Sequence, residues 1–178
     1  VDRGQTASRL SREQYRDNLV RLVTELLRRG ITPLLMTEPR WADDAKPNGV
    51  GEHPNLRLEK YVEACREVAA TWRVPLVDHF AGWSKARKDG VTLRDWTTDG
   101  CHPNPAGHRV LARTMLPVLE TALGHAARIH VRMARTDRRV RVVCFGDSVT
   151  GVYYHTGSRR AYTAMLGLAL EQIGRAHV

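Results

Sequence analysis

The 178-residue sequence has no apolar run approaching the roughly 18 residues that a membrane-spanning helix needs. Its 14 glycines and 8 prolines are near average usage, which argues against a collagen-like or disordered chain. With 42% apolar residues, the composition instead predicts one ordinary globular domain with a hydrophobic core. The chain starts at Val1 rather than Met, and residues 1–10 contain no apolar signal-peptide core. We therefore interpret the start as a processed, trimmed or fragmentary end.

Cysteine and lysine are both scarce. Cys65, Cys101 and Cys144 form neither a CxxC motif nor an even set, which favours free or buried thiols over a disulfide framework. Only four of the 28 basic residues are lysines, which leaves 24 arginines in a chain of net charge +9. An arginine excess can reflect a GC-rich genome as well as phosphate contacts. We interpret the one arginine cluster, between Arg128 and Arg141, as a solvated linker, so no nucleic-acid partner is predicted. The weaker alternative, an arginine-driven nucleic-acid binder, would lose affinity steeply with salt.

Helices and strands are predicted to alternate along the chain, which is typical of an α/β fold. The helices are expected over 11–29, 55–72, 104–119 and 159–173, and the strands near 31–37, 74–78 and 139–145. Ser11 and Gln14 form a capping-box pattern, and Asn55 and Asn104 are expected to cap the second and third helices. Residues 79–101 are expected to be irregular.

A candidate nucleophile follows the last predicted strand. The segment Gly146-Asp-Ser148 is a glycine-bearing turn that would present a serine at the carboxyl edge of the sheet, where open α/β sheets bind their ligands. A serine placed there attacks a carbonyl if a base reaches its hydroxyl. The same residues also suit simple turn chemistry, so this segment alone does not predict an active site.

A candidate base lies in the segment Asp99-Gly-Cys-His102-Pro-Asn, just before the third helix. An aspartate three residues before a histidine can accept from one imidazole nitrogen and leave the other to take a serine proton. The alternative is a helix-capping loop in which Asp99 binds backbone amides and His102 only packs. Cys101 adjoins His102 and is interpreted as a bystander. A metal site is not predicted, since neither His79 nor His108 completes a ligand pattern.

Together the two segments resemble the SGNH (GDSL) hydrolase family of serine esterases and lipases. The resemblance implies a three-layer α/β/α sandwich with a parallel sheet of flavodoxin-like type. It also implies that Ser148 is the nucleophile, His102 the base and Asp99 the acid that orients the base. The family implies no cofactor.

The order of the motifs departs from the family, in which the serine block comes first and the Asp-x-x-His block last. Here the serine block comes last, and the glycine and Gly-x-Asn-Asp blocks are absent, so we expect an incomplete sandwich. Residues 1–123 are predicted to be the C-terminal part of a hydrolase domain, 124–138 a basic linker, and 139–178 the N-terminal part. The second part belongs either to a tandem copy or to the same domain in permuted order.

The predicted activity is hydrolysis of a carboxylic ester, either a small acyl ester or a carbohydrate acetyl ester, through an acyl-serine intermediate. The expected partner is accordingly a small-molecule or carbohydrate ester. Self-association is also expected, because missing strands would expose apolar helix faces. The alternative is a catalytically inactive α/β binding module, or an incomplete fragment, that lacks the oxyanion-hole blocks.

Overall fold

The computed structural model describes residues 7–132, 142–146, 149–150 and 161–175. These residues form two compact units. The first comprises the described residues of Val1–Arg94 together with Asp99–Cys101, and the second those of Asp95–Thr98 together with His102–Val178.

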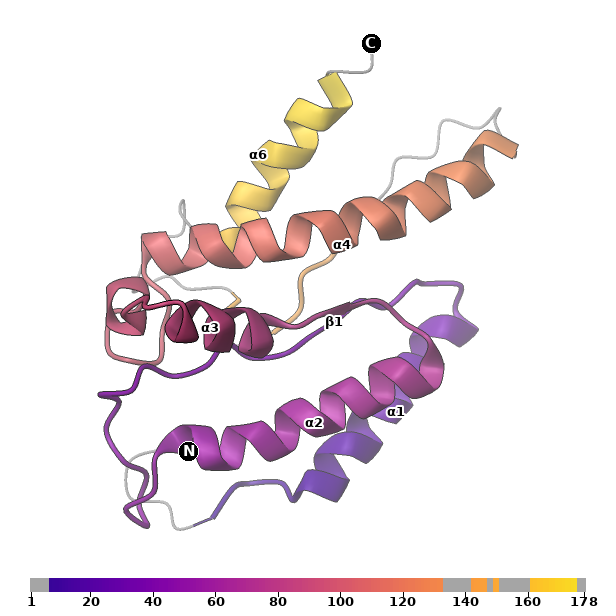
Figure 1. Cartoon of the computed structure of the whole chain (residues 1–178). Helices are drawn as coiled ribbons and strands as arrows, with labels where there is room; N and C mark the ends of the chain where they lie inside the picture. The colour runs from indigo at the N-terminus through magenta and orange to yellow at the C-terminus, as the bar shows by residue number, and fades with distance from the viewer. Residues whose placement is uncertain (1–6, 133–141, 147–148, 151–160, 176–178) are drawn as a thin grey trace. The chain divides into compact units, whose positions relative to one another are not determined.

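A short parallel sheet lies in the first unit. Strand β1 (Leu35–Met36) pairs with β2 (Leu76–Val77), with Leu35 opposite Leu76. Parallel neighbours need a crossover connection, and helix α2 (Pro54–Trp72) supplies it (Figure 1). This βαβ unit confirms the predicted α/β class, although both strands are shorter than the apolar runs that predicted them.

Helix α1 (Arg12–Arg28) begins at the predicted capping box. The Ser11 hydroxyl accepts from the Gln14 N–H at 3.1 Å, and the Gln14 side chain accepts from the Ser11 N–H at 2.9 Å. The apolar residues of α1 are only partly buried. Val23 is fully buried, whereas Leu22 and Leu27 are exposed.

Helices α1 and α2 lie side by side and pack against β1 (Figure 1). Their shared core is built from one residue of α1, one of β1 and three of α2, namely Val23, Leu35, Cys65, Val68 and Ala69. Burial raises the pKa of the Cys65 thiol to about 11, so this cysteine behaves as a small apolar residue. The prediction of free thiols is confirmed for all three cysteines.

The start of α2 differs from the prediction. His53, not Asn55, is the N-cap, and its ring Nδ1 accepts from the Asn55 N–H at 3.2 Å. Pro54 occupies the first helical position, where its missing N–H costs nothing. The buried Asn55 side chain instead binds the N–H and the carbonyl of Trp41, at 2.9 and 3.0 Å. Asn55 therefore anchors the long loop that precedes the helix.

The prediction that residues 79–101 are irregular is wrong. Helix α3 (His79–Lys88) and the 3-10 helix η1 (Leu93–Trp96) occupy most of this range. The Asp78 carboxylate caps α3 by accepting from the Ala81 N–H at 2.9 Å. The buried face of α3 is formed by His79, Phe80 and Trp83 rather than by aliphatic residues, which is why apolar periodicity missed the helix.

The second unit contains helices α4 (Pro105–Arg132) and α6 (Tyr162–Arg175), which contact each other (Figure 1). Both were predicted, but α4 continues into the basic segment expected to be a linker. Among the described helices, none is both long enough and apolar enough to cross a membrane.

The last predicted strand does not form in its described part. Residues 142–146 have no regular secondary structure, and Val143 and Phe145 are 77% and 90% exposed. A single strand is not stable without a neighbour. The described residues of the second unit contain no strand with which this segment could pair.

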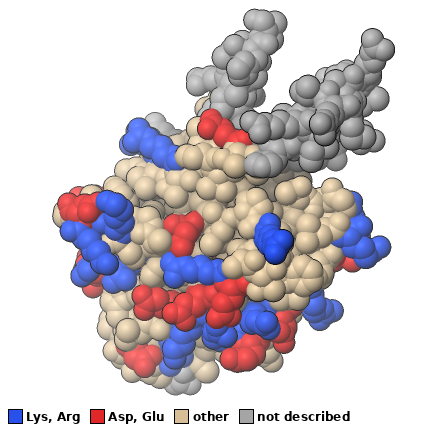
Figure 2. All heavy atoms as spheres, turned by 45° about the vertical axis from the view of Figure 1, so that its right-hand side comes forward, with Lys and Arg blue, Asp and Glu red and all other residues tan. Residues whose placement is uncertain are grey.

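Basic and acidic side chains alternate on the face shown in Figure 2 rather than forming a continuous basic area. Ion pairs account for part of this pattern. On α1, for example, Glu25 pairs with Arg28 and Arg29 at 2.8 and 2.6 Å. On α2, Arg66 pairs with Asp78 at 2.7 Å.

Candidate active site

His102 lies on one arm of a tight turn that leads into α4. Thr97 and Pro103 form an antiparallel bridge, and the Thr98 N–H donates to the His102 carbonyl at 2.8 Å. One residue further out, the Asn104 N–H donates to the Trp96 carbonyl at 2.9 Å. These backbone bonds fix the two arms of the turn against each other.

Asp99 lies at the tip of the turn, in the first unit. Its Oδ1 accepts from the Cys101 N–H at 3.0 Å, as expected for the helix-capping alternative. A carboxylate offers about four lone-pair sites, so a hydrogen bond from a backbone N–H is compatible with a second bond from an imidazole. Gly100, next to Asp99, has φ +89° and accepts from the Ala42 N–H at 2.9 Å.

Asn104 joins the turn to the helix, as predicted. Its Oδ1 accepts from the N–H groups of Ala106 and Gly107 at 2.9 and 3.1 Å and so caps α4. Its Nδ2 donates to the Asp95 carbonyl at 2.8 Å. One side chain thus holds both the first turn of the helix and the start of the turn that bears His102.

Gly107 is a site residue that the sequence reasoning missed. A Cβ built at Gly107 would lie 2.2 Å from the Trp96 carbonyl oxygen, so only glycine permits this approach. The sequence does contain a signal for this role, because a glycine in the first turn of a helix lowers helix stability and usually has a packing reason.

Ser148 lies outside the described residues, as does Asp147. The residues on either side of this pair are described. A Cβ at Gly146 would lie 2.1 Å from the Thr150 Oγ1, so the close approach of Gly146 and Thr150 requires glycine.

A chain of contacts within the second unit links α4 to Thr150. His108 is completely buried on α4, and its Nδ1 accepts from the Tyr162 N–H at 3.2 Å. The two rings stack, with centroids 6.1 Å apart. The Tyr162 hydroxyl donates to the Thr150 Oγ1 at 3.4 Å. His108, six residues after His102, is therefore connected to a residue two positions after Ser148, a link that sequence reasoning did not find.

A second polar cluster lies where β1 and β2 end. The Thr37 hydroxyl donates to Asp78 at 3.1 Å, and Arg66 donates to both Asp78 oxygens at 2.7 and 3.2 Å. Burial alone would raise the pKa of Asp78. The Arg66 guanidinium, the Ala81 N–H and the Thr37 hydroxyl together hold that pKa below its usual value. Asp78 is thus a charged structural residue that ties α2, β1 and α3 together.

The histidine next to Asp78 is buried and neutral. His79 is only 2% exposed, and burial lowers its pKa to about 4. Neither ring nitrogen has a hydrogen-bond partner among the described residues. The described part of the chain also contains no group of three or more side chains placed to hold a metal ion.

The sequence model of the GDSL-like Lipase/Acylhydrolase family matches residues 2–110. The chain belongs to this family. The matched residues include Asp99, His102 and the turn that carries them, and they end before Ser148. Membership confirms the resemblance drawn from the sequence and places the chain among hydrolases of ester type. No curated protein sequence matches the chain.

Proposed function

We propose that this protein hydrolyses carboxylic esters through an acyl-serine intermediate. Ser148 is the nucleophile, His102 the general base, and Asp99 the carboxylate that orients the imidazole. The observation that carries the proposal is the Asp99–His102 turn. It lies inside the family match, and Asn104 braces it against α4.

The proposed reaction has two halves. The Ser148 hydroxyl attacks the ester carbon while His102 takes its proton, and the imidazolium then protonates the departing alcohol. Water, activated by the same imidazole, releases the acid and restores the serine. Asp99 stabilises the imidazolium by accepting from the other ring nitrogen. These steps need no cofactor.

The proposal includes the finer architecture. We place the sheet in a three-layer α/β/α sandwich of flavodoxin-like type, to which β1 and β2 contribute two strands. Residues 1–123 are the part with the Asp/His block, 124–138 the connection, and 139–178 the part with the serine block. The continuation of α4 to Arg132 supports a helical start to that connection.

The test is covalent labelling with a fluorophosphonate, which reacts only with an activated serine. We expect the label on the peptide that contains Ser148. The label should be lost in Ser148→Ala, strongly reduced in His102→Gln, and unchanged in Ser158→Ala, which removes another serine of the same segment. No label on folded protein, or a label elsewhere, would refute the proposed nucleophile.

One set of observations favours the alternative of an inactive binding module. The sequence has no Gly-x-Asn-Asp block. The side chains of Asn48, Asn55 and Asn104 each bind backbone groups, so these asparagines already have structural roles. Loss of one oxyanion donor typically lowers turnover about 10²–10³-fold. The labelling experiment separates the two functions, because an inactive module would leave Ser148 unmodified.

A further inference from the structure

A surface hollow of about 580 Å³ lies in the first unit, between the loop after β1 and the end of α3 with the segment that follows it. Its volume is within the roughly 300–1,000 Å³ typical of small-molecule sites. Asp43 and Asp44 come from the loop after β1, Arg87 comes from the last turn of α3, and the other lining residues come from the segment after α3 and the start of η1, namely Gly90, Val91, Thr92, Leu93 and Arg94.

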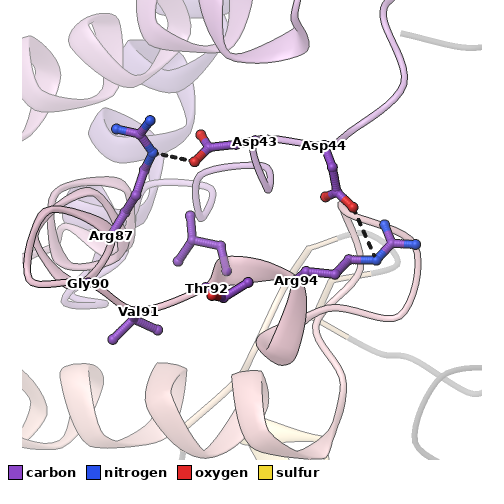
Figure 3. A pocket seen from close by; sticks show the side chains of 8 residues that line it. Asp43, Asp44, Arg87, Gly90, Val91, Thr92 and Arg94 are labelled. Carbon is purple, nitrogen blue, oxygen red and sulfur yellow. Dashed lines mark hydrogen bonds and ion pairs between the residues drawn. The ribbon is translucent and has the colours of Figure 1, made fainter.

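The charged groups around the hollow are arranged as two pairs. Figure 3 shows Asp43 joined to Arg87 on one side and Asp44 joined to Arg94 on the other, with Thr92 between them. The Arg87 guanidinium, by donating to Asp43, holds the pKa of that carboxyl below its usual value, so it stays ionised. The lining therefore carries charges of both signs in equal number.

Local hydrogen bonds hold both walls. At the end of α3, the Gly90 N–H donates to the Arg87 carbonyl at 3.1 Å and the Val91 N–H to the Ala86 carbonyl at 3.0 Å. On the opposite wall, the Ala45 N–H donates to the Ala42 carbonyl at 3.1 Å. Gly90 has φ +95°, and the space that its Cβ would occupy is open, so no side chain obstructs the hollow there.

We propose that this hollow binds a neutral polyhydroxylated ligand, namely a carbohydrate. An anion or a cation gains little where each charge already has an opposite partner, and an acyl chain would need more apolar lining than Val91 and the buried Leu93 provide. Sugar hydroxyls both donate and accept. They therefore match carboxylate acceptors, guanidinium donors and the Thr92 hydroxyl placed side by side.

The hollow adjoins the tip of the proposed catalytic turn. A Cβ at Gly100 would lie 3.2 Å from an Arg94 Nη and 3.3 Å from Ala45, so Arg94 packs against the neighbour of Asp99. A sugar bound beside Arg94 would be the alcohol part of the ester. This role rests on the proposed function, whereas sugar binding itself does not.

Binding is tested on the whole chain by saturation-transfer NMR and titration with cellobiose, xylobiose, maltose and N,N′-diacetylchitobiose. Sodium octanoate and inorganic phosphate represent the competing chemistries. We expect at least one sugar to bind. Its Kd should rise about tenfold in Asp44→Asn and about threefold or more in Thr92→Val. Asp89→Asn, the same change at the exposed Lys85–Asp89 pair outside the hollow, should leave the Kd unchanged.

Three outcomes would overturn the inference: no sugar of the panel binds folded protein, the hollow variants leave the Kd unchanged, or octanoate or phosphate binds in place of the sugars. The probes carry no ester, so failure of sugar binding is distinct from failure of Ser148 labelling. If both succeed, Asp44→Asn should raise the KM for acetylated cellobiose and leave the hydrolysis of p-nitrophenyl acetate unchanged.

Discussion

The buried polar residues at the ends of β1 and β2 stabilise the fold rather than perform chemistry. The Thr37 hydroxyl accepts from the Phe80 N–H at 3.0 Å while it donates to Asp78, so one side chain binds two elements. A buried polar group is compatible with folding when hydrogen bonds within the protein replace the hydrogen bonds that it made to water. His79 differs, because both of its nitrogens are buried without a partner among the described residues.

His79 should make the protein sensitive to acid. Its pKa is about 4 in the folded chain and 6.5 when unfolded, so the unfolded state binds the proton first as the pH falls. The free energy of unfolding should therefore decrease between pH 6.5 and 4, by about 3 kcal/mol in total. Urea unfolding across this pH range measures the loss.

The matched variant is His79→Phe, which cannot titrate. Its free energy of unfolding should fall much less than that of wild type over the same window, with the carboxylates accounting for the remainder. Equal pH dependence in the two proteins would contradict the assignment of a neutral buried His79.

At the scale of the elements, two residues constrain the junction between the turn and α4. Asn104 and Gly107 act together there, since the first caps the helix and the second lets its first turn approach Trp96. The position of His102 depends on this junction, because only Pro103 separates His102 from Asn104.

Gly107→Ala should destabilise the protein although alanine is the better helix former. The new Cβ would overlap the Trp96 carbonyl oxygen, and such overpacking typically costs about 1–3 kcal/mol. The melting temperature should fall by several degrees. Gly167→Ala on α6 is the control, since nothing lies within 4 Å of its Cβ and alanine should raise the melting temperature slightly. A Gly107→Ala protein as stable as wild type would show that the start of α4 shifts away from Trp96 at little cost in free energy.

Tyr162 is predicted to be a positioning residue for the segment around Ser148, since its hydroxyl binds Thr150. Tyr162→Phe should slow fluorophosphonate labelling of Ser148 about fivefold, the equivalent of one hydrogen bond of about 1 kcal/mol. Its melting temperature should fall by only about 2–4 °C. The control is Tyr61→Phe, which removes a hydroxyl bond to the Leu10 carbonyl in the first unit. A labelling rate equal to wild type would mean that Tyr162 only packs.

At the scale of the whole molecule, apolar side chains are exposed in both units. Ile31 in the first unit is exposed, as are Val143, Phe145 and Leu168 in the second. The apolar β-branched residues before Gly146 are typical of a strand, yet they lack a neighbouring strand among the described residues. Exposed apolar surface of this kind favours association.

We therefore expect the 178-residue chain to self-associate as its concentration rises, as measured by size-exclusion chromatography with light scattering. Phe145→Asp combined with Val143→Lys should shift it toward the monomer, because charge disfavours both apolar burial and strand pairing. Leu56→Asp, at an exposed leucine of α2, should leave the self-association unchanged. A wild-type chain that stays monomeric throughout would refute the expectation.

Local signals in the sequence determined the caps of α1 and α4, most helices and the family. The capping box at Ser11, the cap at Asn104 and the Asp99–His102 spacing all depend on residues a few positions apart, which a sequence displays directly. Only the tertiary structure decided the rest. In the folded chain, His53 rather than Asn55 caps α2, and residues 79–88 form helix α3. Residues 142–146 do not form a strand, and Asp44 lies beside Arg94. These outcomes depend on partners distant in sequence or, for residues 142–146, absent from the described part of the chain, and the free energy of such contacts is set by burial and pairing in the folded chain.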